Sequence, residues 1–285
     1  NFGAWQVFKI IMAVAVLAMP ATGWAQHHAG HGVGADHSTI ASEAPSSPAD
    51  HAADTVYDPG EMARARAALR HESGGMTASM IMVDRLEWRP VASGADGYAW
   101  EVEAWAGGDL DRFAFKSKGE GALGRRLEQL ELQAGWSRAL DPWFNVRAGI
   151  RQDVRPRPAR THAVLAIEGL APYWFEVEGE LFLSHKGEVT ARAEASYDQR
   201  ITQRLIAQPA AEVNFSAQDI RELALGSGVT FVELGLRLRY EVAREFAPYV
   251  GVHWERKLGG TARYARLHGD EVGGLRFVAG LRMWF

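Results

Sequence analysis

From residue 73 to the C-terminus, apolar and polar side chains alternate along the chain with a period of two. In the segment FNVRAGIR at 144–151, every second side chain is apolar, and the residues between them are Asn, Arg or Gly. The same pattern recurs at 130–136, 175–183, 189–197 and 232–240. Successive side chains of a strand point to opposite faces, so each segment predicts a β-strand with one apolar and one polar face.

A soluble sandwich also alternates, with its charged face in water, but the connections favour a transmembrane barrel. Tight turns that contain proline alternate with longer links, as the short turns and longer loops of outer-membrane barrels do. The tight turns contain Pro142, Pro172 and Pro248, and the longer links are expected at 119–125, 154–161, 214–228 and 257–274.

Aromatic residues give a second indication. Trp143, Trp174 and Phe246 lie beside the tight turns, where an interfacial aromatic girdle belongs. The last strand carries an unbroken apolar face that ends at Phe285, and it looks like the terminal assembly signal of bacterial outer-membrane barrels.

We therefore predict an all-β fold over 73–285, a transmembrane antiparallel up-and-down β-barrel of about 12 strands. Pro209 predicts a bulge or an edge in one of them. An even number of strands returns the C-terminus to the periplasmic side on which the barrel begins. The strands are expected near 75–90, 97–107, 111–118, 126–139, 142–155, 161–169, 172–184, 187–199, 201–213, 229–243, 247–257 and 274–285.

Residues 1–25 have the pattern of a secretory signal peptide. Lys9 precedes the apolar run at 10–19, and small residues up to Ala25 predict cleavage after that position. The run is too short to cross a bilayer as a helix, which needs roughly 20 apolar residues.

Residues 26–72 predict a flexible periplasmic tail, with a short helix over 58–71 that Asp58 caps. Up to residue 53, Ala, Gly, Ser, Pro and His dominate without a periodic apolar stripe, so this part is expected to be disordered. It carries five of the ten histidines of the chain, namely His27, His28, His31, His37 and His51. Imidazole binds Cu(II) most strongly in the usual affinity order, which predicts a metal-binding tail. The alternative is a polar linker that happens to contain histidine.

The charged strand faces predict a lumen in which acidic and basic side chains form paired networks, because an unpaired enclosed charge is costly. The principal lumen charges are Glu131, Glu176, Glu178, Glu180, Arg147, Arg151, Arg237 and Arg239. Two interpretations stay open: a filled lumen whose ion pairs only rigidify the barrel, and a cation or small-solute path lined by carboxylates.

Five residues of the barrel segment are further candidate metal ligands. Met76, Met80 and Met82 cluster at the first strand, where thioethers suit Cu(I), on a face that is either lumenal or lipid-facing. His162 and His253 fall on inward positions, where a hydrogen-bonded wall histidine is the alternative to a ligand.

Composition excludes other classes. The absence of cysteine excludes disulfides, thiolate zinc sites and a cysteine nucleophile. The formal net charge of −4 implies no nucleic-acid surface. Ser184 and His185 are adjacent, but neighbours on a strand face opposite ways, so we expect neither an enzyme nor an organic cofactor.

Several stretches, in order along 75–285, resemble the outer-membrane copper resistance protein B family. They are DRLEWR at 84–89, WAGGDLDR at 105–112, GIRQD at 149–153, GLAPYWFEV at 169–177, TQRL at 202–205 with QP at 208–209, GLRLRYEVAREFAPY at 235–249 and GLRMWF at 280–285.

The resemblance implies a periplasmic metal-binding tail joined to a small barrel that handles copper in the outer membrane of a Gram-negative cell. Its partners would be outer-membrane lipid, copper ions and periplasmic copper-handling proteins. Family tails are rich in Met and His, whereas no Met occurs here between Met19 and Met62, which favours Cu(II) over Cu(I) at the tail. The leading hypothesis is copper sequestration or transport through the tail and the lumen. The alternative is a general channel with an incidental tail.

Overall fold

The computed structural model describes residues 52–73, 76–91 and 94–285. The strands are β1 (Ala78–Arg89), β2 (Gly97–Gly107), β3 (Asp111–Ala122), β4 (Leu127–Ala139), β5 (Phe144–Arg155), β6 (Arg160–Ala171), β7 (Phe175–Ser184), β8 (Val189–Tyr197), β9 (Gln199–Arg200), β10 (Leu205–Ser216), β11 (Gly228–Tyr240), β12 (Phe246–Lys257) and β13 (Gly273–Trp284). The helical elements are η1 (Ala52–Thr55), α2 (Pro59–Ser73), η2 (Pro172–Trp174), η3 (Arg221–Leu223) and α3 (Gly259–His268).

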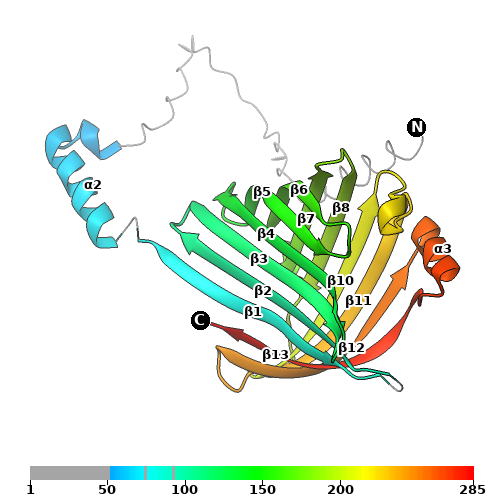
Figure 1. Cartoon of the computed structure of the whole chain (residues 1–285). Coiled ribbons are helices and arrows are strands. Elements are labelled where there is room, and N and C mark those ends of the chain that lie inside the picture. The colour runs from blue at the N-terminus through cyan, green and yellow to red at the C-terminus, as the bar shows by residue number, and fades with distance from the viewer. Residues whose placement is uncertain (1–51, 74–75, 92–93) are drawn as a thin grey trace, which may run out of the picture. The chain divides into compact units, whose positions relative to one another are not determined.

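The strands form one closed antiparallel barrel (Figure 1). Each long strand pairs with its neighbours in sequence, and β1 pairs with β13, for example Leu86 opposite Leu281. The short strand β9 continues the line of β8 beside β10. Within the described residues the barrel therefore has twelve long strands, which confirms the predicted fold class.

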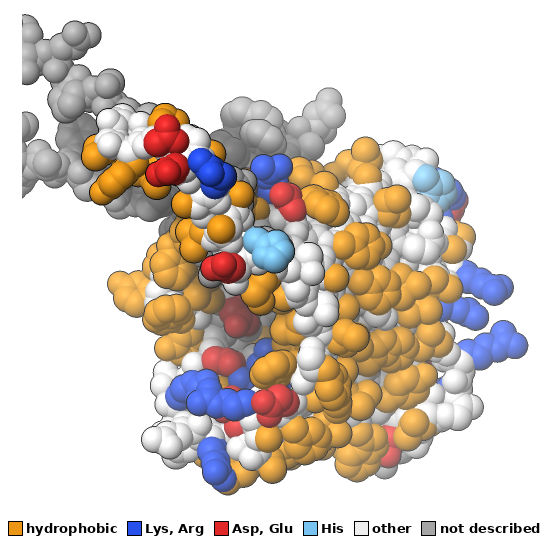
Figure 2. Space-filling view, turned by 90° about the vertical axis from the view of Figure 1, so that its left-hand side faces the viewer, with side chains coloured by type: hydrophobic (Ala, Val, Ile, Leu, Met, Phe, Trp, Pro, Cys, Tyr) orange, Lys and Arg blue, Asp and Glu red, His pale blue; other side chains and the backbone are white. Residues whose placement is uncertain are grey.

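The wall of the barrel has the polarity that the alternation predicts. Along β6, Leu165 and Ile167 point outward and are 54% and 45% exposed, while the alternate residues Val164 and Ala166 point inward and are buried. Figure 2 shows apolar side chains spread over the wall, with most Lys and Arg side chains in view at the margins of this area. An apolar exterior around a charged interior is the arrangement of a barrel that crosses a membrane.

The two ends of the barrel differ. We call the end at which β1 begins and β13 finishes the terminal end, and the opposite one the loop end. Tight turns at 140–143, 172–174 and 241–245 lie at the terminal end. In the first of them, the Asp141 carboxylate accepts hydrogen bonds from the backbone N–H groups of Trp143 and Phe144 at 2.7 and 2.8 Å. The longest described links, 217–227 and 258–272, lie at the loop end and carry η3 and α3.

Two predicted long links are short, because their strands continue farther than expected. The link predicted at 119–125 is only 123–126, and the one at 154–161 is only 156–159. The glycines of β3 belong to the strand because Gly119 pairs with Trp100 of β2 and makes room for its ring. A Cβ at Gly119 would lie only 2.3 Å from a carbon of that indole. Glycine here marks a close approach rather than a loop.

The strand predicted at 201–213 is shifted, since β10 runs from Leu205 to Ser216. The Thr202 hydroxyl accepts hydrogen bonds from the backbone N–H groups of Arg204 and Leu205 and thereby fixes a turn before the strand. Pro209 lies inside β10, which is not an edge strand as the prediction allowed. The ladder is instead interrupted opposite Pro209, between the end of β8 and the start of β9, where no N–H donor is needed.

The described residues 52–73 and Met76 belong to a compact unit separate from that of the barrel. In this unit α2 lies over residues for which the sequence predicts a helix, and the Asp58 carboxylate accepts a hydrogen bond from the N–H of Glu61 at 2.8 Å. The Arg66 guanidinium pairs with both carboxylate oxygens of Asp54. The signal peptide and the five tail histidines, predicted within 1–51, lie outside the described residues. In the described part of the chain, no helix combines the length and the apolar character that a bilayer-crossing helix needs.

Candidate functional site

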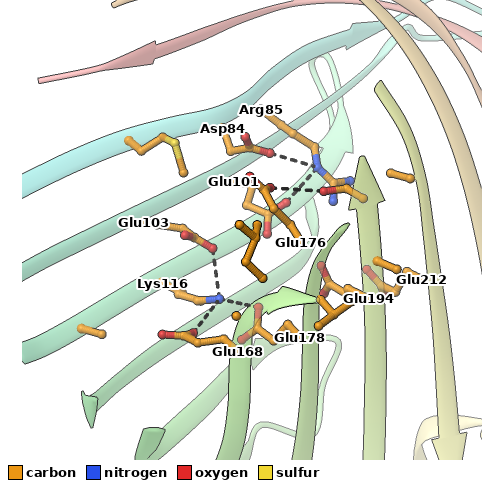
Figure 3. A pocket seen from close by; sticks show the side chains of 18 of the residues that line it. Asp84, Arg85, Glu101, Glu103, Lys116, Glu168, Glu176, Glu178, Glu194 and Glu212 are labelled. Carbon is orange, nitrogen blue, oxygen red and sulfur yellow. Dashed lines mark hydrogen bonds and ion pairs between the residues drawn. The ribbon is translucent and has the colours of Figure 1, made fainter. Parts of the chain in front are cut away.

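A cavity of about 450 Å³ occupies the half of the lumen nearest the terminal end (Figure 3). Of the described residues, nine carboxylates and five basic side chains line it. The acidic residues are Asp84, Glu101, Glu103, Glu168, Glu176, Glu178, Glu194, Glu212 and Glu233, and the basic ones are Arg85, Arg112, Lys116, Arg237 and Arg282. Glu176 lines the cavity and is exposed, so the cavity is open to solvent at this end. The lining has an excess of negative charge.

Lys116 of β3 lies among three carboxylates on the cavity wall (Figure 3). Its ammonium nitrogen is 2.6 Å from Glu178 of β7, 3.1 Å from Glu103 of β2 and 3.8 Å from Glu168 of β6. Arg147 also contacts Glu178 at 2.6 Å and Glu168 at 3.5 Å, so two basic groups face these three carboxylates. The remaining excess of negative charge leaves the wall able to attract another cation.

A second group of ion pairs joins β1, β2, β3, β8 and β11. The Arg85 guanidinium is 2.8 Å from Glu101 and 3.2 Å from Glu233, and the Lys118 ammonium is 2.8 Å from Glu101 and 2.5 Å from Glu194. The predicted pairing of lumen charges is therefore present here.

Farther from the terminal end, the lumen is filled by buried charges. Arg192 contacts Glu131 at 2.8 Å and Glu180 at 3.3 Å. Arg147 contacts Glu180 at 3.0 Å and Glu178 at 2.6 Å. Glu131 and Arg147 are each only 1% exposed, so their charges are compensated by protein groups rather than by water.

The remaining predicted lumen charges also face inward. Arg237 pairs with Glu87 at 2.8 Å, and Arg239 pairs with Asp198 at 2.5 Å. Arg151 contacts Glu131 and Asp153 at 2.9 and 2.7 Å. At the cavity mouth, the Glu176 carboxylate accepts a hydrogen bond from the Ser196 hydroxyl. The structure thus places all eight predicted lumen charges on the inner face.

Each of the two lumenal histidines has acidic neighbours of its own. The ring of His253 is 3.2 Å from Glu233 through Nδ1 and 3.2 Å from Glu255 through Nε2. His162 is buried against Phe182, with Nδ1 3.7 Å from Asp153. Within the described residues, no three His, Asp or Glu groups are arranged to hold a metal ion. Neither histidine therefore belongs to a preformed metal cluster in this part of the chain.

The three methionines are not brought together as a cluster. Met82 lines the cavity, and its sulfur lies 3.5 Å from a guanidinium nitrogen of Arg282. Met80 is half-buried two residues earlier on β1, whereas Met76 is 70% exposed and belongs to the other unit. The lumenal face of β1 therefore offers Met82 as a thioether whose sulfur accepts a hydrogen bond from Arg282.

Three cavity carboxylates are missed by the alternation alone: Asp84, Glu168 and Glu212. Asp84 lies at a β-bulge between Val83 and Leu86, where the period of two breaks. The inward position of Glu168 could have been predicted, because Glu168 lies six residues after His162 on the same strand and therefore on the same face. Glu212 follows Pro209, where the expected interruption left the facing of later residues undefined.

At the loop end, ion pairs connect separate links. Glu222 of η3 is 2.6 Å from both Arg160 and Lys186, and Arg160 also contacts Glu188 at 3.0 Å. Hydrogen bonds from Lys186 and Arg160 lower the pKa of the Glu222 carboxyl to about 2. Ser184 donates to Glu188 as well, and His185 faces Thr161 instead of Ser184.

The chain matches a family model described as "Copper resistance protein B precursor (CopB)" over residues 77–285. The chain belongs to the copper resistance protein B family. Copper resistance protein B of Escherichia coli is 44% identical over 206 residues, which cover 72% of this chain and 69% of that protein. A homologue from Pseudomonas syringae pv. tomato is 42% identical over 207 residues, which cover 73% of this chain and 70% of that one.

Solved structures with a similar fold include two porins. The NanC porin has a TM-score of 0.47 at 13% identity, over 72% of this chain and 99% of that one. The KdgM porin has a TM-score of 0.43 at 10% identity, over 73% of this chain and 99% of that one. Family membership confirms the resemblance found in the sequence, and with the barrel it assigns the chain to copper resistance and to the outer membrane.

Proposed function

We propose that the chain supports copper resistance by binding copper ions at two places, the histidine tail and the acidic cavity. In this proposal the terminal end of the barrel faces the periplasm, so the tail and the cavity mouth share one compartment. Copper reaches them from that compartment, where periplasmic copper-handling proteins are the expected partners. The ion is then sequestered or passed on through the barrel.

The excess of carboxylates in the cavity carries this proposal. Clefts lined by charge of one sign concentrate the opposite ion, and protein walls of low dielectric strengthen the effect. Imidazole suits Cu(II), and a mixed set of nitrogen and oxygen ligands in a tetragonal arrangement also holds it. Cu(I) would need thioether ligands, and the lumenal thioether of Met82 accepts a hydrogen bond from Arg282. The donor set of the cavity and tail therefore favours Cu(II), and Cu(I) at methionine is the secondary form.

The survival of cells in the presence of copper tests the proposal. Cells that lack the gene are complemented with the full chain, with a form lacking 26–51, or with the cavity variant Glu103→Gln/Glu176→Gln. We expect each altered form to give lower copper tolerance than the full chain, because each removes copper-binding groups. The matched control is Glu271→Gln, a carboxylate that is 82% exposed at the loop end. Full tolerance with the tail deletion and the cavity variant combined would contradict the proposal.

A further inference from the structure

Ion pairs cross the lumen from one wall of the barrel to the other. Lys118 of β3 reaches Glu194 of β8 at 2.5 Å, although four strands separate β3 from β8 on one side and six on the other. Arg192 of β8 reaches Glu131 of β4 at 2.8 Å. Such contacts are nearly diametric, so side chains occupy the centre of the lumen at this level.

The side chains that cross the lumen are largely buried. We call Lys118, Glu131, Arg147, Glu180 and Arg192 the floor of the cavity. Four of the five are no more than 6% exposed, although all of them point into the lumen. In a water-filled pore, lining charges remain hydrated. An apolar cluster that includes Phe182 lies beside the floor, and the guanidiniums of Arg151 and Arg192 face its ring at 4.4 and 5.6 Å.

The floor and the cavity share carboxylates. Glu178 lines the cavity and binds Arg147 of the floor at 2.6 Å. Glu194 lines the cavity and binds Lys118, and Glu212 lines it and lies 3.5 Å from Arg192. In the described residues no three of these groups are placed to hold one metal ion, so the carboxylates must leave their basic partners to bind it. A cation that binds them from the cavity side therefore competes directly with the basic groups that hold the floor closed.

From these contacts we infer that the floor is a gate, and that a divalent cation in the cavity opens it by taking the carboxylates of Glu178, Glu194 and Glu212 from Lys118, Arg147 and Arg192. In the state described here, the barrel is a chamber entered from the terminal end. A ligand shifts such an equilibrium only by binding one state more tightly, and the shared carboxylates provide this difference. The identity of the cation as copper rests on the proposed function, whereas closure by the floor does not.

Conductance of the full chain in planar lipid bilayers tests the gate. Without copper, the unaltered chain should be closed in a potassium chloride solution. The double variant Lys118→Ala/Arg192→Ala should conduct, because the crossing side chains are gone. Arg276→Ala is the matched control, since Arg276 pairs with Glu255 and Glu271 outside the floor. The exchanged pair Lys118→Glu/Glu194→Lys should stay closed, and circular dichroism establishes that each variant keeps its β-structure.

Copper(II) chloride added to both sides should open the unaltered chain and leave the conductance of the double variant nearly unchanged. The gate is overturned if the unaltered chain conducts as well as the double variant without copper. It is also overturned if copper leaves the chain that lacks 26–51 closed while metal analysis of the same vesicles finds copper bound. The tail is removed in this measurement because it is itself a proposed copper site. If no copper is bound, the proposed function fails instead, and the copper-free comparison still decides whether the floor closes the lumen.

Discussion

Replacing Leu165 with arginine is expected to destabilise the barrel in lipid by about 2–4 kcal/mol. Leu165 lies at the middle of β6, points outward and is 54% exposed in the protein alone. Its neighbours on the adjacent strands are Ala148 and Leu181, so no carboxylate stands opposite to pair with a new guanidinium. The cost arises because hydrocarbon gives the charge neither water nor a partner. Equilibrium unfolding by guanidinium chloride in lipid vesicles measures it.

The matched control is Leu267→Arg, because Leu267 is 75% exposed but lies on α3 outside the strands. There the arginine remains in water, and we expect a change within about 0.5 kcal/mol. If both arginines cost equally little, the wall of the barrel is in contact with water and the membrane assignment of its outer face is wrong.

Replacing Arg192 with alanine is expected to lower the free energy of unfolding by about 3–5 kcal/mol, because it leaves buried carboxylates without their counter-ion. The guanidinium lies 2.8 Å from Glu131 and 3.3 Å from Glu180, and the Arg192 side chain is 5% exposed. Glu131 still contacts Arg151 at 2.9 Å, so in this variant its charge remains partly compensated. Denaturant unfolding in lipid again gives the value.

Two further variants distinguish the effect of burial on the free energy of unfolding from the effect of charge. Arg276→Ala removes a guanidinium whose side chain is 31% exposed, and we expect a cost of no more than about 1 kcal/mol. Adding Glu131→Gln to Arg192→Ala should recover part of the loss, since it neutralises a carboxylate that lost a partner. A loss for Arg192→Ala as small as that for Arg276→Ala would show that the floor is solvated and its ion pairs are weak.

The strands and their facing could be predicted because a membrane barrel imposes a strict local rule. Each outward side chain meets lipid and each inward one meets the lumen, so the period of two is visible in β5, β7 and β11. The rule fails where the backbone departs from it. The bulge between Val83 and Leu86 depends on the pairing of β1 with β2 and β13, and nothing in β1 alone indicates it. Gly119 and its neighbours were predicted to form a loop because the aromatic ring that fills their space belongs to another strand.

The partners within the lumen could not be predicted, because they depend on closure of the barrel. Alternation assigns side chains such as Glu131 and Arg147 to the inner face, but it does not reveal that Lys118 meets Glu194 across the lumen. The same holds for His253, whose two ring nitrogens face Glu233 and Glu255. Its role as a metal ligand stays a prediction. Lumenal facing is local information, whereas contact across the lumen is set by strand order and register.

The two proposals share the carboxylates of the cavity. Glu103 and Glu176 lie on the cavity side of the floor, while Glu178, Glu194 and Glu212 connect the cavity to it. Neutralising Glu103 and Glu176 should weaken cation binding without removing the groups that hold the floor closed. We therefore expect the lumen to bind copper independently of the histidine tail.

The most direct measurement is the amount of Cu(II) bound per chain by equilibrium dialysis in lipid, for a chain that lacks 26–51. We expect this chain to bind copper, and to lose that binding when it also carries Glu103→Gln/Glu176→Gln but not when it carries Glu271→Gln. Copper binding that is absent without the tail, or that is unchanged by the two cavity substitutions, would contradict a copper site in the lumen.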